Sequence, residues 1–203
     1  MCKLLMALVC AAAPVAAQAA TYILDESAFN AALSAGSASV PLHGIGFGNP
    51  INTSNPLATG NGTYSGTISS TGGLFSLVGA LSTGNLPASI DISFAGSPNS
   101  VNAVGLHAGA TDFFGNYVDV PVIVTLDDGT TQTLSTQGFV GFVSTSPIAT
   151  CTVRVSDESG YSSAYYSTIH DVVFGEGTVP EPMALSLVAA GGAMFLRRRR
   201  QRA

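Results

Sequence analysis

Histidine, serine and acidic side chains are the groups in this chain whose chemistry could support catalysis or metal binding. The histidines are His43, His107 and His170, and none of them stands in an HxH or HxxxH spacing that would bring two ligands together. The many serines lack a GxSxG motif that would expose one of them as a nucleophile. The sequence therefore predicts no catalytic residue and no metal site, with the histidines at solvent-facing positions.

Four acidic residues fall in expected turns: Asp127, Asp128, Asp157 and Glu158. Carboxylates in turns can bind a structural Ca²⁺ together with backbone carbonyls, as in many extracellular β-sandwiches. Asp is also common in turns because its side chain bonds to nearby backbone amides, and no DxDxDG loop is present. Structural calcium and purely local hydrogen bonding both remain open.

Three tyrosines, Tyr161, Tyr165 and Tyr166, stand close together in ESGYSSAYYST. Tyrosine rings on a loop could stack on sugar rings, which makes these residues the candidate ligand contacts. They could equally cover the hydrophobic core, and the chain has no Trp to strengthen the carbohydrate hypothesis.

The elements that would position these side chains are expected to be strands. The segment VPVIVTLDDGTTQTLS predicts a hairpin over residues 122–134, because Val122, Val124 and Leu126 alternate with other residues before an Asp-Gly turn. Residues 44–73 are expected to form long loops with one strand at 64–69. Further strands are expected at 74–78, 89–94, 101–108, 139–143, 150–156 and 168–174.

One short helix is expected near the start of the mature chain, in TYILDESAFNAALSAG. Asp25 is its predicted N-cap, and Gly36 fits the position just after its end. Together the elements predict an all-β fold: an antiparallel β-sandwich of jelly-roll type with one short N-terminal helix.

Charge separates the ends of the chain from its middle. Between residues 20 and 178 stand eleven acidic residues and a single basic one, Arg154, a formal charge of −10. Such a surface repels phosphate backbones, so nucleic-acid binding is not expected. The other basic residues are Lys3 and five arginines after residue 196.

The first 19 residues have the three parts of a secretory signal peptide. Lys3 supplies the positive start, an apolar run follows, and Ala17-Gln18-Ala19 is a small-x-small cleavage site. Cleavage after Ala19 by signal peptidase, following export through the Sec translocon, would remove Cys2 and Cys10. Cys151 would then be the remaining cysteine, and its alternating neighbours predict a small core residue.

The last 25 residues have a second tripartite pattern. Pro180, Glu181 and Pro182 precede an uncharged apolar run at 183–196, and Arg197, Arg198, Arg199 and Arg200 follow it. As a helix, the run would measure about 21 Å against roughly 30 Å of bilayer hydrocarbon, which predicts a marginal membrane span. The arginines would hold that end in the cytoplasm.

This tail resembles the PEP-CTERM sorting signal of Gram-negative bacteria that make exopolysaccharide. The resemblance implies recognition of residues 180–182 by an exosortase, a membrane-embedded cysteine protease, with 183–196 as a transient inner-membrane stop. With the signal peptide and the expected strands, this gives three regions: a signal peptide (1–19), a β-sandwich domain (20–178) and a sorting signal (179–203). The middle more loosely resembles other exported PEP-CTERM proteins, in segments such as 104–106 and 171–175.

The function expected from these features is that of an exported, non-enzymatic surface or extracellular-matrix protein associated with exopolysaccharide or biofilm. Its precursor would be anchored in the inner membrane facing the periplasm, and the product would lie at the cell surface or outside. A carbohydrate-binding, lectin-like module and a secreted hydrolase are the alternatives.

Overall fold

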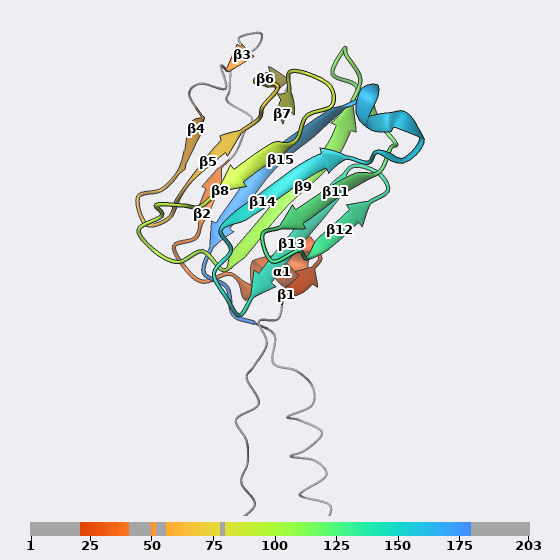
Figure 1. Cartoon of the computed structure of the whole chain (residues 1–203). Coiled ribbons are helices and arrows are strands. Elements are labelled where there is room, and N and C mark those ends of the chain that lie inside the picture. Colours follow the sequence, from red (N-terminus) through yellow and green to blue (C-terminus); the bar gives the residue numbers. More distant parts are fainter. Residues whose placement is uncertain (1–20, 41–49, 52–55, 78–79, 180–203) are drawn as a thin grey trace, which may run out of the picture.

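The computed structural model describes residues 21–40, 50–51, 56–77 and 80–179. These residues form fifteen strands, one α-helix and a short 3-10 helix. The strands build two antiparallel sheets that face each other, so the prediction of an antiparallel β-sandwich is confirmed (Figure 1). The expected signal peptide, the Pro180–Pro182 motif, the apolar run and the arginines lie outside the described residues.

The nine-stranded sheet has β9 and β15 at its centre. The strand order is β1-β13-β9-β15-β7-β6-β3, with β10 also paired to β9 and β2 to β15. Its strands are β1 (Thr21–Leu24), β2 (Ala38–Val40), β3 (Pro50–Ile51), β6 (Leu74–Leu77), β7 (Ala80–Thr83), β9 (Ala103–Thr111), β10 (Tyr117–Val118), β13 (Gly138–Ser144) and β15 (Tyr166–Gly175).

The six-stranded sheet has the order β12-β11-β14-β8-β5-β4. Its strands are β4 (Leu57–Gly60), β5 (Ser65–Ser69), β8 (Ile90–Ser93), β11 (Val122–Leu126), β12 (Thr131–Leu134) and β14 (Thr150–Val155). The predicted hairpin is confirmed as β11 and β12, with Gly129 at a φ of 86° in its turn. Only glycine adopts that conformation without strain, which fixes the Asp-Gly turn.

The main core lies between the two sheets. Alternate residues of β11 and β14 point into it, as their buried–half-buried alternation shows. Cys151 is one of these buried residues, as predicted. Burial raises the pKa of its thiol to about 12, so the group stays protonated and unreactive in the folded protein.

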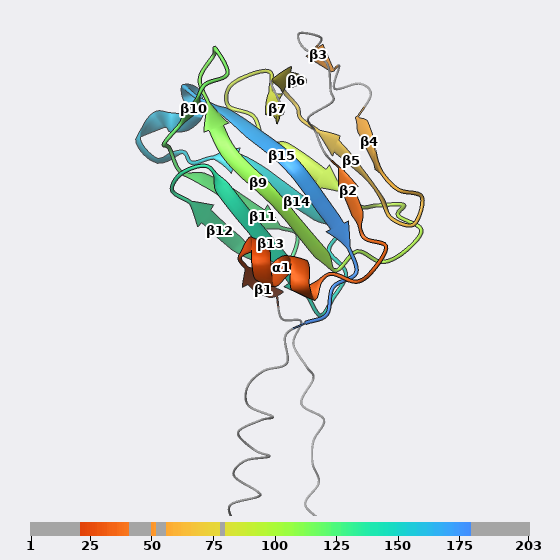
Figure 2. The same ribbon diagram turned by 180° about the vertical axis from the view of Figure 1, so that it is seen from behind.

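A second, smaller core lies under helix α1 (Glu26–Ala32), on the face of the nine-stranded sheet turned away from the six-stranded sheet. We call this face the outer face (Figure 2). Phe29 packs on Gly105 of β9 and Gly141 of β13, where a β-carbon would stand 2.5 Å from its ring. The helix packs flat against the sheet because both glycines lack side chains.

The helix lies in the predicted segment but is shorter than predicted. Asp25 is the N-cap as predicted, and its carboxylate accepts a hydrogen bond from the Ala28 amide at 2.8 Å. The four residues before it form strand β1 rather than helix, because they pair with β13. The helix ends at Ala32, so Gly36 lies in a later turn and does not follow its last residue.

Strand β4 was expected to be a loop, and the structure corrects this. Residues 57–60 pair with β5, so the small and polar residues of this region form a hairpin where one strand was expected. A pairing partner supplies hydrogen bonds that the local sequence does not reveal. No helix among the described residues has the length and apolar content that crossing a membrane requires.

The described chain begins and ends at the same end of the sandwich (Figure 1). Gly175, near the end of the domain, pairs with Ala103 at the start of β9, whereas Tyr166 pairs with Thr111 at its end. Eight steps of about 3.3 Å separate the two positions, or about 26 Å. The loop that follows β9 therefore lies far from the residues that lead to the C-terminal tail.

Candidate functional site

Two histidines far apart in sequence meet on the outer face. His107 of β9 pairs directly with His170 of β15 across the ladder, so both side chains point to the same face. Their rings stack with centroids 4.6 Å apart and planes 14° from parallel. Their side chains are only 25% and 19% exposed, so the expectation of solvent-facing histidines is wrong for this pair. His43 lies outside the described residues.

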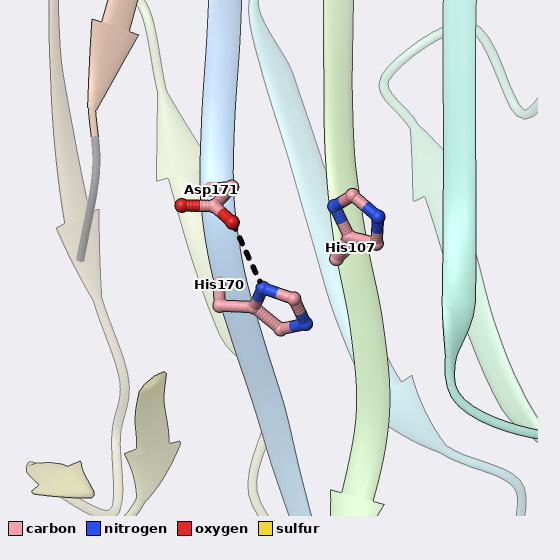
Figure 3. Close-up of side chains that lie close together, drawn as sticks. All are labelled: His107, His170 and Asp171. Atoms are coloured by element: carbon pink, nitrogen blue, oxygen red, sulfur yellow. Dashed lines mark hydrogen bonds and ion pairs between the residues drawn. The ribbon is translucent and has the colours of Figure 1, made fainter. Parts of the chain in front are cut away.

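Asp171 joins the pair because β15 contains a bulge. Two residues, Asp171 and Val172, occupy the space opposite Leu106 alone, and Asp171 has a φ of 52°. That left-handed conformation is uncommon for a residue with a β-carbon, although Asp tolerates it better than most residues. The carboxylate oxygen Oδ2 lies 3.1 Å from Nδ1 of His170. Figure 3 marks this contact with a dashed line.

Other polar groups surround the two rings. Nε2 of His170 lies 3.0 Å from the amide nitrogen of Gln137. Nε2 of His107 lies 3.7 Å from a carboxylate oxygen of Glu26, in the first turn of α1. Nδ1 of His107 is buried and has no hydrogen-bond partner among the described residues. Three of the four ring nitrogens thus have a polar neighbour, whereas Nδ1 of His107 has no hydrogen-bond partner in the described part of the chain.

Burial lowers the pKa of His107, and the neighbouring His170 lowers it further. The carboxylates of Glu26 and Asp171 act in the opposite direction but do not outweigh these effects. The ring therefore favours the neutral form, which keeps a nitrogen lone pair free. Within the described ranges, His107, His170 and Asp171 are the one group of three metal-ligand side chains whose ligand atoms lie within 4.8 Å of one another.

A pocket of about 440 Å³ opens on the outer face beyond the histidine pair; we call it the aromatic pocket. Five aromatic residues line it: Phe75, Phe113, Phe114, Tyr117 and Tyr166. Tyr117 connects the pocket to the histidine pair, with its ring 6.4 Å from that of His170. Gly109 leaves room for this tyrosine, because a β-carbon there would stand 3.2 Å from the ring.

The loop after β9 presents two phenylalanines to solvent. Phe113 is 79% exposed and Phe114 is 83% exposed, with their rings edge to face at 5.7 Å. Asp112 organises this loop: its carboxylate accepts hydrogen bonds from the amides of Phe114 and Asn116 and from the Asn116 side chain, at 2.8 to 3.0 Å. These bonds, the Asn116 side chain first, lower the pKa of Asp112. Exposed apolar rings on an ordered loop are typical of a binding surface.

Buried hydroxyl groups support the pocket from the sheet. Ser82 and Thr111 line it, and Thr168 lies beside them in β15. The Thr168 hydroxyl lies 2.9 Å from that of Thr111 and donates to that of Ser82 at 3.0 Å. The pocket thus combines aromatic rings at its rim with hydroxyl groups at its base.

The structure separates the three candidate tyrosines. Tyr166 lines the aromatic pocket, as a ligand contact would. Tyr161 lies in the 3-10 helix (Glu158–Ser163), and Tyr165 follows it; both pack against the main core with their rings 6.2 Å apart. Core covering thus accounts for Tyr161 and Tyr165. The pair Phe113-Phe114 was missed, although two adjacent large aromatics between Asp112 and Gly115 are a recognisable signal of an exposed turn.

The turn carboxylates considered for calcium are mostly engaged by other protein groups, some local and some distant in sequence. The carboxylate of Asp127 accepts hydrogen bonds from the backbone amides of Ala149 and Thr150. The carboxylate of Asp128 accepts hydrogen bonds from the backbone amide of Thr130 and the hydroxyl of Thr21. Asp157 pairs with Arg154 at 2.9 Å at the opposite end of β14. The described acidic residues of these turns therefore do not gather into one site.

Comparisons with protein-family models, with curated proteins and with solved structures found no match to this chain.

Proposed function

We propose that this protein is an exported, non-enzymatic surface protein that binds polysaccharide through the aromatic pocket. The observation that carries the proposal is the pocket itself: a 440 Å³ hollow with five aromatic residues and buried hydroxyls on an ordered face. Sugar rings present apolar C–H faces that stack on aromatic side chains and hydroxyls that hydrogen-bond at their edges. Binding pockets generally combine such apolar walls with a few placed polar groups.

The charge of the domain favours a neutral or weakly charged glycan. Residues 20–178 carry a formal charge of −10, which repels polyanions such as nucleic acids. Asp112 adds a carboxylate at the pocket, and a carboxylate is a strong acceptor for sugar hydroxyls. The proposed activity of the surface protein is therefore lectin-like glycan binding, and no hydrolase activity is proposed.

The position of the pocket supports delivery by the C-terminal tail. The residues leading to Pro180 leave the domain at one end of the nine-stranded sheet, and the loop of residues 112–116 lies at the other end. If the sorting signal holds the precursor at the inner membrane, the pocket would be directed away from the bilayer. A PEP-CTERM signal in exopolysaccharide-producing bacteria is consistent with an exported glycan-binding product.

The order of strands supports a jelly-roll type of sandwich. From β7 to β9 and again from β13 to β15, consecutive strands alternate between the two sheets. The order β7-β15-β9-β13 stands in one sheet opposite β8-β14-β11 in the other. We infer that the domain shares the glycan-binding architecture common among jelly-roll lectins.

Affinity electrophoresis through gels containing the producing organism's own exopolysaccharide tests the binding activity. Wild-type protein should be retarded, and Phe113→Ala/Phe114→Ala should migrate as in a gel without polysaccharide. Thr131→Ala/Thr133→Ala is the matched control, because both threonines are exposed on β12 of the other sheet. Equal retardation of all three proteins, or no retardation of the wild type, would remove the proposal.

Deletion of residues 180–182 tests the sorting step separately. The deleted protein should accumulate in the inner-membrane fraction, and the intact protein should reach the cell surface or the medium. Intact mass measurement of the delivered product should show both ends trimmed. Normal delivery of the deleted protein would exclude sorting by Pro-Glu-Pro without affecting the glycan-binding result.

A further inference from the structure

We propose that His107, His170 and Asp171 form a binding site for a first-row transition-metal ion, with Zn²⁺ as the ion best matched. The site lies beside the aromatic pocket on the outer face, and it goes beyond the proposed glycan binding. Figure 3 shows the three side chains close together on two neighbouring strands, with His170 and Asp171 on β15 and His107 on β9.

The spacing of the donor atoms is close to that of a bound ion. Zinc–nitrogen bonds measure about 2.0–2.1 Å, so two ligand atoms of a tetrahedral site stand about 3.3 Å apart. Nδ1 of His170 and Oδ2 of Asp171 are already 3.1 Å apart. One ligand atom from each of the three residues can be taken so that all three lie within 4.8 Å of one another, compared with about 3.3 Å in a bound site.

An unpaired nitrogen provides a second, independent indication. Nδ1 of His107 is buried without a hydrogen-bond partner among the described residues, although buried polar atoms are nearly always paired. The Nε2 nitrogen of the same ring faces Glu26, and Figure 3 shows the other side of the ring turned towards Asp171. A metal ion between the two strands would provide the missing partner.

Glu26 supplies the outer contact that metal-binding histidines usually have. Such a histidine commonly donates its second ring N–H to a carboxylate, which fixes the tautomer and orients the ring. The 3.7 Å separation between Glu26 and Nε2 of His107 is slightly longer than a hydrogen bond, and rotation of the exposed Glu26 side chain would shorten it. Helix α1 thus holds a carboxylate behind the first ligand.

Two imidazoles and one carboxylate favour transition metals over calcium or magnesium. Imidazole nitrogen suits Zn²⁺, Cu²⁺ and Ni²⁺, whereas Ca²⁺ and Mg²⁺ take oxygen ligands. Three protein ligands leave a fourth position, which water would fill. The side-chain amide of Gln137 lies 3.0 Å from Nε2 of His170, so it would contact the ring nitrogen that does not bind the ion and orient that ring.

Binding has a structural requirement that can be measured. A nitrogen lone pair lies in the plane of its ring, so two rings stacked 14° from parallel do not aim at one point. The rings must leave the stack when the ion binds. Zinc binding should therefore shift the imidazole resonances of two histidines in the wild-type protein.

Isothermal titration of the chelator-treated, untagged full-length chain with ZnCl₂ provides the test, with exposed thiols alkylated beforehand. The wild type should bind one Zn²⁺ at this site, and excess Mg²⁺ or Ca²⁺ should not compete. His107→Ala and His170→Ala should each weaken binding about 100-fold, and Glu26→Gln about tenfold. His43→Ala, the third histidine of the chain, is the matched control and should bind as the wild type does.

Two measurements on the wild type keep the test decisive if a variant fails to fold. Co²⁺ added in place of zinc should give the visible absorption of a four-coordinate ion with nitrogen and oxygen ligands. NMR should show the resonances of two histidines, and not of the third, shifting on addition of zinc. The proposal would be overturned if the heat of zinc binding persisted in His107→Ala/His170→Ala. It would also be overturned if the wild type showed no visible Co²⁺ absorption or no shift of the histidine resonances.

Discussion

The contact between Phe29 and Gly105 determines how α1 docks on the outer face, and it gives a prediction about non-additive mutations. Phe29 is fully buried, and a β-carbon at Gly105 would stand 2.5 Å from Cε1 of its ring. The three nearest atoms to that β-carbon also include Cζ of Phe139, at 2.8 Å. Phe139 is only half-buried, so its ring can move aside.

Each single substitution should destabilise the protein for a different reason. Phe29→Ala removes a buried ring and leaves a cavity, which should cost about 3–5 kcal/mol in the free energy of unfolding. Gly105→Ala places a methyl group inside the contact distance of a fixed ring, and overpacking of this kind costs about 1–3 kcal/mol.

The double variant should be more stable than the sum of these losses predicts. With the ring of Phe29 absent, the new methyl group fills part of the cavity, and Ala in place of Gly contributes about 0.5–1 kcal/mol to strand stability. Gly105→Ala should therefore be neutral or stabilising in the Phe29→Ala background. The expected coupling between the two sites is about 1–4 kcal/mol.

Urea unfolding followed by circular dichroism measures all four corners of this cycle. Gly36→Ala serves as a control glycine, because a β-carbon there meets nothing within 4 Å and its cost comes from backbone conformation alone. Its effect should be the same with and without Phe29. Additive losses for Phe29→Ala and Gly105→Ala would show that the ring does not fill the space above Gly105.

Three further predictions concern other parts of the molecule. The pKa of the Cys151 thiol is raised from 9.0 to about 12, so with rising pH the unfolded chain loses this proton before the folded protein does. The free energy of unfolding should therefore fall above pH 9 by about 1.4 kcal/mol per pH unit, and urea unfolding of Cys151→Val should show a smaller fall over the same pH range. Thr168→Val leaves the buried hydroxyls of Thr111 and Ser82 without this partner and should lower the free energy of unfolding by about 1–3 kcal/mol. An unchanged midpoint in thermal or urea unfolding would contradict the hydroxyl contacts. Asp112→Ala removes the acceptor of the Phe114 and Asn116 amides, so hydrogen exchange at both should accelerate while exchange in β9 stays slow.

The parts of the fold that the sequence predicted depend on short-range patterns. Asp25 caps the helix, Asp128-Gly129 turns the hairpin, and Cys151 alternates into the core because neighbouring residues determine each of these features. Strand β1 escaped prediction because its hydrogen bonds come from β13, about 120 residues later in the chain. Short-range pattern does not encode that partner.

The candidate site depends on pairing between distant strands. His107 and His170 are separated by 62 intervening residues, and they meet only because β9 and β15 adopt one particular register. A shift of one residue would turn one ring into the core. The aromatic pocket is similar, since Phe75, Phe113 and Tyr166 come from three separate segments. Tyr166 was a predicted contact, and the sequence around Phe113 indicates an exposed turn, but only the assembled sheet brings the three residues to one pocket.

The bulge at Asp171 changes which residues of β15 face the main core. Before it, the odd-numbered Ile169 faces the main core; after it, the even-numbered Val172 and Phe174 do so. In a regular ladder Asp171 would follow Ile169 inward and place a carboxylate among apolar side chains. On the edge of β15 that does not pair with β9, the partner strand changes at this additional residue from β7 to β2. A single inserted position thus lets β15 present polar groups along one half and an apolar contact for α1 along the other.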